Sequence, residues 1–165
     1  MSPHAHHAHD AGAVGCGVIT ISDTRNEADD TSGQRIRALL EEHGHRVTYY
    51  RIVKDEPEQI AAVIAGAPDA VEVIVCNGGT GVARRDTTYE AITRLLEKEI
   101  SGFGELFRVL SYEQIGAAAM LSRATAGVAG RRVIFSLPGS TKAVELAMSK
   151  LIIPQLGHVV GLVRG

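Results

Sequence analysis

Hydrophobic and polar positions change along the chain in blocks that predict strands and helices in turn. Four runs predict strands, three of them apolar and rich in β-branched residues and one alternating: 14–22, 70–76, 132–136 and 46–53. Apolar residues three and four positions apart predict helices over 31–43, 56–65, 88–98 and 141–151, and a mixed stretch predicts shorter ones at 105–110 and 113–123. Because strands that alternate with helices form βαβ crossovers, we expect a mostly parallel sheet covered on both faces. The predicted fold class is α/β, as a single three-layer α/β/α domain.

Residues that favour helix ends stand at several of the predicted boundaries. Asp30 or Thr31 can cap the first helix through its side-chain oxygen, and Gly44 can end that helix. Ser140 or Thr141 can cap the last helix in the same way. The segments between elements contain no linker, charge block or repeat, so one domain accounts for this part of the chain.

The composition fits one globular domain with an ordinary core. Hydrophobic residues make up 45% and charged residues 22% of the 165 positions, which excludes a disordered chain. The formal net charge is −2 and aromatic residues are only 4%, so neither duplex nor single-stranded nucleic acid is an expected partner. The 18 glycines are the unusual feature, and they favour loops where the backbone turns sharply or approaches a ligand closely.

Residues 1–13 differ in character from the rest of the chain. They contain four histidines among Ala, Gly and Asp, namely His4, His6, His7 and His9. Such a stretch can bind a transition metal loosely, but we expect a flexible tail followed by a folded domain over 14–165. The stretch lacks the basic start and the apolar segment of a signal peptide.

The cysteines and the longest apolar segment indicate the compartment. Cys16 and Cys76 are the only cysteines, and each lies inside an apolar run, which favours two small buried side chains in a reducing compartment. The apolar segment nearest to the length of a membrane span, at 151–163, is interrupted by Pro154, Gln155 and His158. We therefore expect a cytoplasmic protein with no membrane partner.

The segments that directly follow the predicted strands carry the polar residues of interest. In open parallel sheets, ligands bind beyond the carboxyl ends of the strands, where these segments converge. Three of the four segments contain a carboxylate and two are rich in glycine; they are 22–24, 54–56, 77–86 and 137–140. Backbone N–H groups bind phosphate oxygens, and carboxylates bind Mg²⁺. The sequence therefore predicts a site for a phosphate and a divalent cation at this edge.

The segment GGTG at 78–81 is a weak signal by itself, because glycines often serve only to turn the chain after a strand. It matches neither the Walker A pattern nor the dinucleotide-binding fingerprint, which must follow a strand and open a helix. Arg84, Arg85 and Asp86 lie a few residues further on, at the mouth of a predicted helix. These cationic groups and the carboxylate favour a binding site over a simple turn.

The charged residues at this edge each have two interpretations. Asp86 either caps a helix or acts as a functional acid, and Asp55 either stabilises the start of the second helix or pairs with Asp86 across adjacent strand ends. For Arg123 and Lys142, a solvated surface charge is expected unless a phosphate lies nearby. Three more acids are either loop acids or further polar ligands: Asp23, Asp29 and Asp30.

Taken in order, these segments resemble the MoaB/MogA family of molybdenum cofactor biosynthesis proteins, whose domain also occurs in gephyrin. The matching stretches span roughly 14–155 and are ISDTR at 21–25, DDTSG at 29–33, IVKDE at 52–56, GGTG at 78–81, RRDTTYEA at 84–91, GFGELFR at 102–108, LSRATAGVAG at 121–130 and LPGSTKA at 137–143. Each piece is weak alone, whereas the ordered set is highly specific. The stretches at 110–116 and 138–143 are closer to MoaB than to MogA.

The resemblance implies a molybdopterin-binding domain that is an adenylyltransferase in active relatives. In that reaction the terminal phosphate of molybdopterin attacks the α-phosphate of Mg-ATP, giving adenylyl-molybdopterin and pyrophosphate. The resemblance implies that Asp55 and Asp86 are the essential acids and bind Mg²⁺. The residues expected to bind substrate or nucleotide are Ser22, Asp23, Gly78, Gly79, Thr80, Gly81, Pro138, Gly139 and Ser140.

Three classes of function remain open from the sequence. The first is the adenylyltransferase, with Mg²⁺ as cofactor, ATP as co-substrate and molybdopterin as substrate. The second is a non-catalytic protein of the same pathway that holds or delivers molybdopterin in the same pocket. The third is a generic flavodoxin-like domain, which would require the ordered motifs to be a coincidence. Relatives form trimers or hexamers, and the MoaB-like segments favour a homohexamer; other proteins of the molybdenum cofactor pathway are possible partners.

Overall fold

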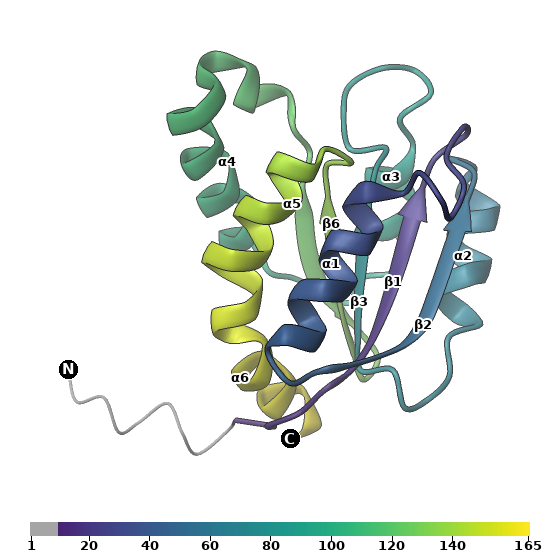
Figure 1. The fold of residues 1–165 in the computed structure, drawn as a ribbon, viewed down its shortest axis with the longest axis vertical. Helices are drawn as coiled ribbons and strands as arrows, with labels where there is room; N and C mark the ends of the chain where they lie inside the picture. Colours follow the sequence, from purple (N-terminus) through teal and green to yellow (C-terminus); the bar gives the residue numbers. More distant parts are fainter. Residues whose placement is uncertain (1–9) are drawn as a thin grey trace.

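The computed structural model describes residues 10–165 of the chain (Figure 1). Residues 1–9, which include all four histidines of the predicted tail, lie outside the described residues. The rest of that stretch contacts the domain, because the backbone N–H of Ala11 donates to the carbonyl oxygen of Gly157, 2.9 Å away. Contacts with the domain are therefore already present a few residues before the first strand.

A six-stranded sheet forms the middle layer of the domain (Figure 1). Its strands lie in the order β2-β1-β3-β6-β5-β4, and their bounds are β1 Gly15–Ile21, β2 Arg46–Val53, β3 Val73–Asn77, β4 Lys98–Glu99, β5 Thr125–Ala129 and β6 Arg132–Leu137. The strands β2, β1, β3 and β6 are mutually parallel, whereas β5 runs antiparallel to β6 and to β4. The predicted mostly parallel sheet is confirmed.

Helices cover both faces of this sheet. Their bounds are α1 Thr31–Glu42, α2 Pro57–Ala65, α3 Thr88–Thr93, α4 Ser101–Ile115, α5 Thr141–Ala147 and α6 Ile153–Arg164, with a 3₁₀ segment at Gly116–Leu121 and a π-helical turn at Met148–Ile152. The helices α1, α4, α5 and α6 pack on one face, and α2 and α3 pack on the other (Figure 1). The predicted three-layer α/β/α class is therefore confirmed.

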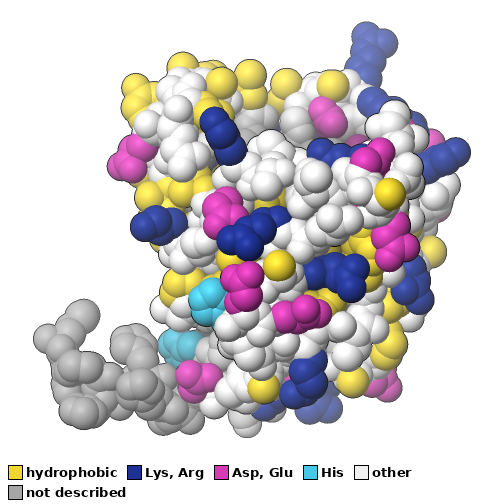
Figure 2. All heavy atoms as spheres, viewed as in Figure 1, with side chains coloured by type: hydrophobic (Ala, Val, Ile, Leu, Met, Phe, Trp, Pro, Cys, Tyr) yellow, Lys and Arg dark blue, Asp and Glu magenta, His cyan; other side chains and the backbone are white. Residues whose placement is uncertain are grey.

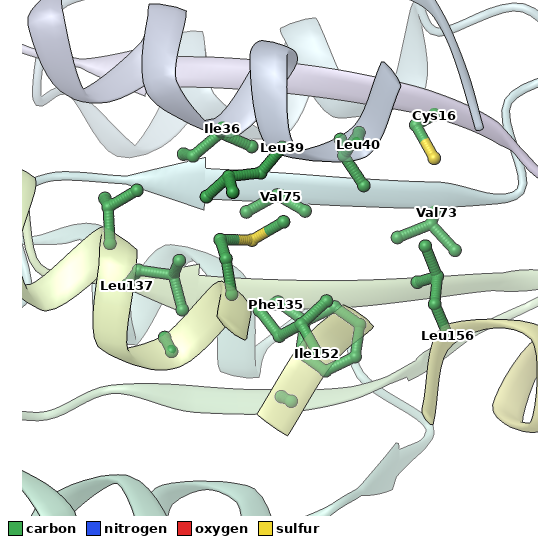
Figure 3. Packing of buried hydrophobic residues seen from close by; sticks show 14 of the residues in the cluster. Cys16, Ile36, Leu39, Leu40, Val73, Val75, Phe135, Leu137, Ile152 and Leu156 are labelled. Carbon is green, nitrogen blue, oxygen red and sulfur yellow. The ribbon is translucent and has the colours of Figure 1, made fainter. Parts of the chain in front are cut away.

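The two faces of the sheet support two separate hydrophobic cores. In β3, Val73 and Val75 point into the larger core, while Ile74 and Cys76 point into the smaller one. Figure 3 shows the larger core, where side chains of α1 and the C-terminal helices meet those of β3 and β6. Because both faces are covered, the central strands β1 and β3 are buried along their whole length, whereas most positions of the edge strand β2 are partly or fully exposed.

Both cysteines are buried thiols. Cys16 and Cys76 have no exposed surface and form no disulfide. Burial raises the pKa of each thiol to about 12, so both stay protonated near neutral pH. Their interpretation as small buried hydrophobic side chains is confirmed.

The predicted helix ends are confirmed where a side chain or a glycine specifies them. The carboxylate of Asp30 accepts a hydrogen bond from the backbone N–H of Gly33 (3.1 Å), and Ser140 Oγ accepts one from that of Ala143 (3.2 Å). Asp30 and Ser140, rather than the threonines that follow them, are therefore the caps. Gly44 adopts a φ of +84° directly after α1, which glycine tolerates and other residues rarely adopt.

Two predictions about helices in the region between α2 and β6 are wrong. The helix expected over 88–98 stops at Thr93, because the next residues pair with β5: the N–H of Glu97 donates to Val128 O and that of Ile100 to Ala126 O. The two short helices expected at 105–110 and 113–123 are one helix, α4, followed by a 3₁₀ segment. Gly116, with a φ of +69°, sets the boundary between them.

The strand β5 was not predicted from the sequence. Its residues TAGVA are small, and Gly127 leaves no side chain to signal a strand. A Cβ on Gly127 would lie 2.4 Å from the carbonyl oxygen of Lys98, so the close approach of β4 requires glycine there. The small residues that allow β5 to lie close to β4 also give no hydrophobic pattern from which a strand could be predicted.

The last helix extends beyond the predicted end at Leu151. It continues through the π-helical turn into α6, so Pro154 does not interrupt it. Proline has no backbone N–H and cannot donate a helical hydrogen bond. The backbone hydrogen bonds change to the π-helical pattern at Met148–Ile152, just before Pro154. The run Thr141–Arg164 is long and apolar enough to cross a membrane by length and composition, a test that core helices also pass. Seven of its side chains are buried in the larger core: Val144, Leu146, Ala147, Met148, Ile152, Leu156 and Val160.

We expect His45 to make the protein less stable at mildly acidic pH. Its Nδ1 accepts a hydrogen bond from the backbone N–H of Val14 (3.2 Å), and burial lowers the pKa of the imidazole below its usual 6.5. The folded state therefore favours neutral His45, so this contribution is complete above pH about 6.5 and is lost as pH falls through the lowered value. Urea unfolding between pH 7 and pH 5 measures it. The free energy of unfolding should fall less between pH 7 and pH 5 in His45→Asn than in the wild type. An equal fall in the two proteins would show that His45 does not contribute to this pH dependence.

Candidate functional site

The carboxyl ends of the parallel strands meet at one edge of the sheet, as predicted. The register places Thr20 of β1 beside Asn77 of β3, and Asn77 beside Leu137 of β6. On the other side, Ile21 of β1 lies beside Val53 of β2. The segments that begin one residue later therefore start side by side, and they form the candidate site.

The two glycine-containing loops of this edge are in direct contact. The N–H of Gly78 donates to the carbonyl oxygen of Leu137 (2.9 Å), and a Cβ on Gly139 would lie 3.3 Å from the Cα of Gly78. Gly78 has a φ of +109°, and a Cβ there would lie only 2.1 Å from the carbonyl oxygen of Ile21. Glycine is therefore required for the loops after β1, β3 and β6 to pack together.

Asp55 lies against this glycine loop and is almost completely buried. Its Oδ1 accepts hydrogen bonds from the N–H and Oγ1 of Thr87, at 3.2 and 2.7 Å, and from Thr88 Oγ1 at 3.4 Å. Its Oδ2 faces Gly79, where an added Cβ would lie 2.3 Å away. Asp55 therefore joins the loop after β2 to the start of α3, rather than serving only its own helix α2.

Asp86 lies on the other side of the same loop. Its Oδ2 accepts a hydrogen bond from the N–H of Ala83 (3.0 Å), and a Cβ on Gly81 would lie 2.8 Å from that oxygen. The N-terminal cap position of α3 is Thr87, so the alternative role of Asp86 as the helix cap is wrong. The two acids, Asp55 beside Gly79 and Asp86 beside Gly81, thus flank the glycine loop.

These two carboxylates are the groups at this edge that could take part in holding a divalent cation. Within residues 10–165, no group of three or more His, Cys, Asp or Glu side chains is placed to hold a metal ion by itself. Magnesium is commonly bound through one or two carboxylates together with the phosphates of a substrate. Asp55 and Asp86 are the residues that would hold it, with the remaining positions filled by phosphate and water oxygens.

Asp23 and Arg85 tie three of the loops together. Arg85 donates from Nε and Nη2 to the two carboxylate oxygens of Asp23, at 2.7 and 2.9 Å, and forms an ion pair with Glu56 at 2.9 Å. Asp23 also accepts from the N–H of Asp55 (3.1 Å). The Arg85 guanidinium holds the pKa of Asp23 below its usual range. The carboxylate of Asp23, expected to bind a substrate, is therefore occupied in holding the site together.

Ser22 has a similar local role. Its Oγ accepts hydrogen bonds from the N–H groups of Thr24 and Arg25, at 3.2 and 3.0 Å, and so shapes the turn after β1. Asp29 likewise accepts from the N–H of Asn26 (2.7 Å) within the loop. Of the acids on this first loop, Asp29 is thus a loop acid, and Asp30 is the buried cap of α1.

Arg123 is a residue of the site that sequence reasoning missed. Instead of a solvated charge, it donates from Nε to Gly81 O (2.9 Å) and from Nη2 to Asp86 O (3.0 Å), and it forms an ion pair with Glu90. Its backbone N–H also donates to Thr80 O (2.8 Å). Arg123 therefore holds the glycine loop in place. The one sequence feature that could have indicated this role is its position in LSRATAGVAG, a stretch that matches the family.

An unpaired arginine and a hollow lie beside Asp86. Within the described part of the chain, the exposed side chains of Arg84 and Lys142 make no hydrogen bond or ion pair, as expected for Lys142. A hollow of about 420 Å³ borders Asp86 and is lined by three arginines, Arg84, Arg94 and Arg123. The arrangement suits a ligand that carries several negative charges.

The fold and this edge define a class of protein, the open α/β domains, whose ligand sites lie at the carboxyl ends of parallel strands. The sequence model of one family, described as "Probable molybdopterin binding domain", matches residues 17–158. The chain is 58% identical over 149 residues to molybdenum cofactor biosynthesis protein B of Bacillus cereus, covering 88% of each chain, and 52% identical over 167 residues to that of Bacillus subtilis, covering 99% and 98%. This chain therefore belongs to the MoaB family of molybdenum cofactor biosynthesis proteins.

Solved structures agree with this assignment. A crystal structure of molybdenum cofactor biosynthesis protein B superposes with a TM-score of 0.90 at 55% identity, covering 93% of this chain and 98% of the other. The tungsten cofactor synthesizing protein MoaB from Pyrococcus furiosus gives 0.84 at 40% identity, again covering 93% and 98%. The resemblance inferred from the ordered motifs is confirmed.

Proposed function

We propose that this protein binds molybdopterin at the carboxyl edge of its sheet and adenylylates it with Mg-ATP. In the proposed step, a terminal phosphate oxygen of molybdopterin attacks the α-phosphorus of ATP. A new P–O bond forms, the bond from the α-phosphorus to the bridging oxygen of the β-phosphate breaks, and pyrophosphate leaves with that electron pair. The attacking phosphate is already an anion, so no side chain needs to remove a proton.

The observation that carries this proposal is the glycine loop flanked by two carboxylates. Asp55 lies beside Gly79 and Asp86 beside Gly81, so a phosphate bound to the loop amides would lie between the two acids. Bound Mg²⁺ would supply the positive charge that draws the phosphates together and stabilises charge on the leaving pyrophosphate. The two acids would hold and orient the Mg²⁺ ion. Arg123 keeps the loop in place through its hydrogen bonds to the carbonyl oxygens of Gly81 and Asp86.

The loop Pro138–Ser140 is proposed to bind the phosphate of molybdopterin. It contacts the first glycine loop through Gly78 and Gly139, so two bound anions would be brought close to each other. Phosphoryl-type transfer depends mainly on such positioning and on cancellation of charge, because the protein itself forms no covalent bond. Arg84 is unpaired at the mouth of the site and would interact with the triphosphate.

The test is to incubate purified protein with molybdopterin, Mg²⁺ and ATP and to search for adenylyl-molybdopterin by mass spectrometry. The proposal predicts the product in complete mixtures and none when EDTA is added. A protein that binds molybdopterin in stoichiometric amounts but forms no adenylylated product under any of these conditions would be the non-catalytic delivery protein instead.

We propose in addition that the protein assembles as a homohexamer of two trimers through the face formed by α4 and the 3₁₀ segment. Six large apolar side chains on these elements are each at least half exposed, namely Leu106, Val109, Tyr112, Ile115, Met120 and Leu121. Figure 2 shows hydrophobic side chains gathered over this part of the molecule. Apolar patches of this kind on a globular domain commonly mark interfaces.

We expect the double substitution Val109→Asp and Met120→Asp to reduce the mass measured by light scattering, because two charges would have to be buried at the interface. The control is Val82→Asp, which changes an exposed valine outside this face and should leave the assembly intact. A wild-type protein that is a stable monomer at low micromolar concentration would refute both the trimer and the hexamer.

A further inference from the structure

A buried carboxylate lies beneath the site, in a network of polar side chains that the proposed chemistry does not use. Asp30 has no exposed surface, and its Oδ2 accepts hydrogen bonds from Thr20 Oγ1 (2.6 Å) and from the hydroxyl of Tyr50. Its Oδ1 accepts from the N–H of Gly33 (3.1 Å). A second branch runs through Ser32 Oγ, which donates to Asn77 Oδ1 (2.7 Å). The network connects α1 with three strands at the edge that carries the site.

Arg25 links this network to the loop after β6. Its Nη1 donates to Ser32 Oγ (2.6 Å) and lies 3.8 Å from Asp30 Oδ1. Its Nη2 donates to the carbonyl oxygen of Gly139 (3.0 Å), 114 positions along the chain. The backbone of Arg25 is itself fixed, because its N–H donates to Ser22 Oγ. One guanidinium therefore holds the Gly139 carbonyl relative to the buried carboxylate.

Fixing the carbonyl of Gly139 also fixes the direction of the backbone N–H of Ser140. The C=O and N–H groups of a trans peptide unit point in opposite directions, and the described residues contain no cis peptide bond. The carbonyl of Gly139 points towards Arg25, so the N–H of Ser140 in the same peptide unit points away from it. Within residues 10–165, that N–H donates no hydrogen bond, and Ser140 is exposed. It is thus available to an anion.

The geometry points to Arg25 as a positioning residue for the molybdopterin phosphate, a conclusion that rests on the proposed function of the Pro138–Ser140 loop. Arg25 orients the Gly139–Ser140 peptide so that its N–H faces the bound anion. The planar guanidinium supplies two separate N–H groups in a fixed fork, which reach Ser32 Oγ and Gly139 O at once. A lysine at this position keeps the charge but has a single nitrogen, so it cannot reproduce the fork.

The test compares Arg25→Lys and Arg25→Gln with the matched control Arg35→Gln. Arg35 is exposed to a similar extent, 35% against 32% for Arg25, but its guanidinium pairs with the carboxylate of Glu145 on α5 instead of with a loop carbonyl. Both Arg25 variants should raise the Kd and the KM for molybdopterin about tenfold or more, because the Ser140 N–H would no longer be oriented to donate its hydrogen bond to the anionic phosphate. The KM for ATP, and kcat at saturating molybdopterin, should change less than about threefold. Arg35→Gln should match the wild type.

Two results would overturn the assignment. Wild-type Kd for molybdopterin in Arg25→Lys would show that only the charge matters, and equal losses in all three variants, accompanied by equal falls in unfolding temperature, would show a general structural role. The Kd for molybdopterin is measured for the wild type and all three variants in addition to turnover. If the wild type binds molybdopterin without adenylylating it, the proposed enzyme activity fails while the Kd comparison still tests Arg25.

Discussion

Asp86→Asn is expected to reduce adenylyl transfer by at least about 100-fold while molybdopterin still binds, because the electrostatic contribution of a single group to such steps is of this order. Asparagine is nearly isosteric, and its carbonyl oxygen can still accept the hydrogen bond from the N–H of Ala83 that now ends on Asp86 Oδ2 at 3.0 Å. The loop should therefore keep its shape. What is lost is the negative charge beside Gly81, which holds Mg²⁺ in the proposed mechanism.

The control for this substitution is Asp69→Asn. Asp69 is exposed and borders a different hollow, one lined by Arg46 and Arg131, so the same chemical change should leave turnover unchanged. Turnover and molybdopterin affinity are measured separately for each protein at saturating ATP. Turnover in Asp86→Asn within twofold of the wild type would contradict the role assigned to Asp86.

Gly78→Ala should destabilise the fold by about 3 kcal/mol or more, the largest stability effect expected for a single methyl group in this site. The added Cβ would lie 2.1 Å from the carbonyl oxygen of Ile21, which is backbone and cannot rotate away. In addition, the φ of +109° lies in a region that L-residues rarely adopt. The loop would have to separate from the end of β1. The free energy of unfolding, measured with urea, tests this directly.

Gly130→Ala separates these two causes. Gly130 also has a positive φ, +60°, but a Cβ there meets nothing within 4 Å. This variant should therefore lose only about 1 kcal/mol, from the backbone conformation alone. Equal losses in the two variants would mean that the contact with Ile21 does not determine the requirement for glycine at position 78.

The main strands and the place of the site could be predicted because they follow from local signals. The apolar run of β3 is directly followed by the glycines of the loop, and the loop by Asp86, so one stretch of sequence indicates a strand, its end and its chemistry. The parallel topology then brings Asp55 to the same edge, but the expectation of adjacent strand ends is wrong, because β1 lies between β2 and β3. Pattern and topology thus bring both acids to one edge, whereas the choice of Asp55 and Asp86 as the essential pair came from the family resemblance.

The parts that could not be predicted depend on contacts between distant residues. Arg123 is one of several arginines in the sequence, and only the fold shows that it reaches the carbonyl oxygens of Gly81 and Asp86. The bond from Arg25 to Gly139 likewise joins residues 114 positions apart. Asp23 carries a carboxylate where a ligand was expected, but Arg85, from another loop, pairs with it. No spacing rule identifies which charges are already paired.

The most direct test of the central claim is the ratio of pyrophosphate released to molybdopterin consumed. The proposed reaction predicts one pyrophosphate for each molybdopterin converted to its adenylylated form, with both products absent when EDTA is added and formed at least about 100-fold more slowly by Asp86→Asn. Formation of ADP and phosphate instead, or full binding of molybdopterin with no consumption of ATP, would contradict the assignment of this protein as a molybdopterin adenylyltransferase.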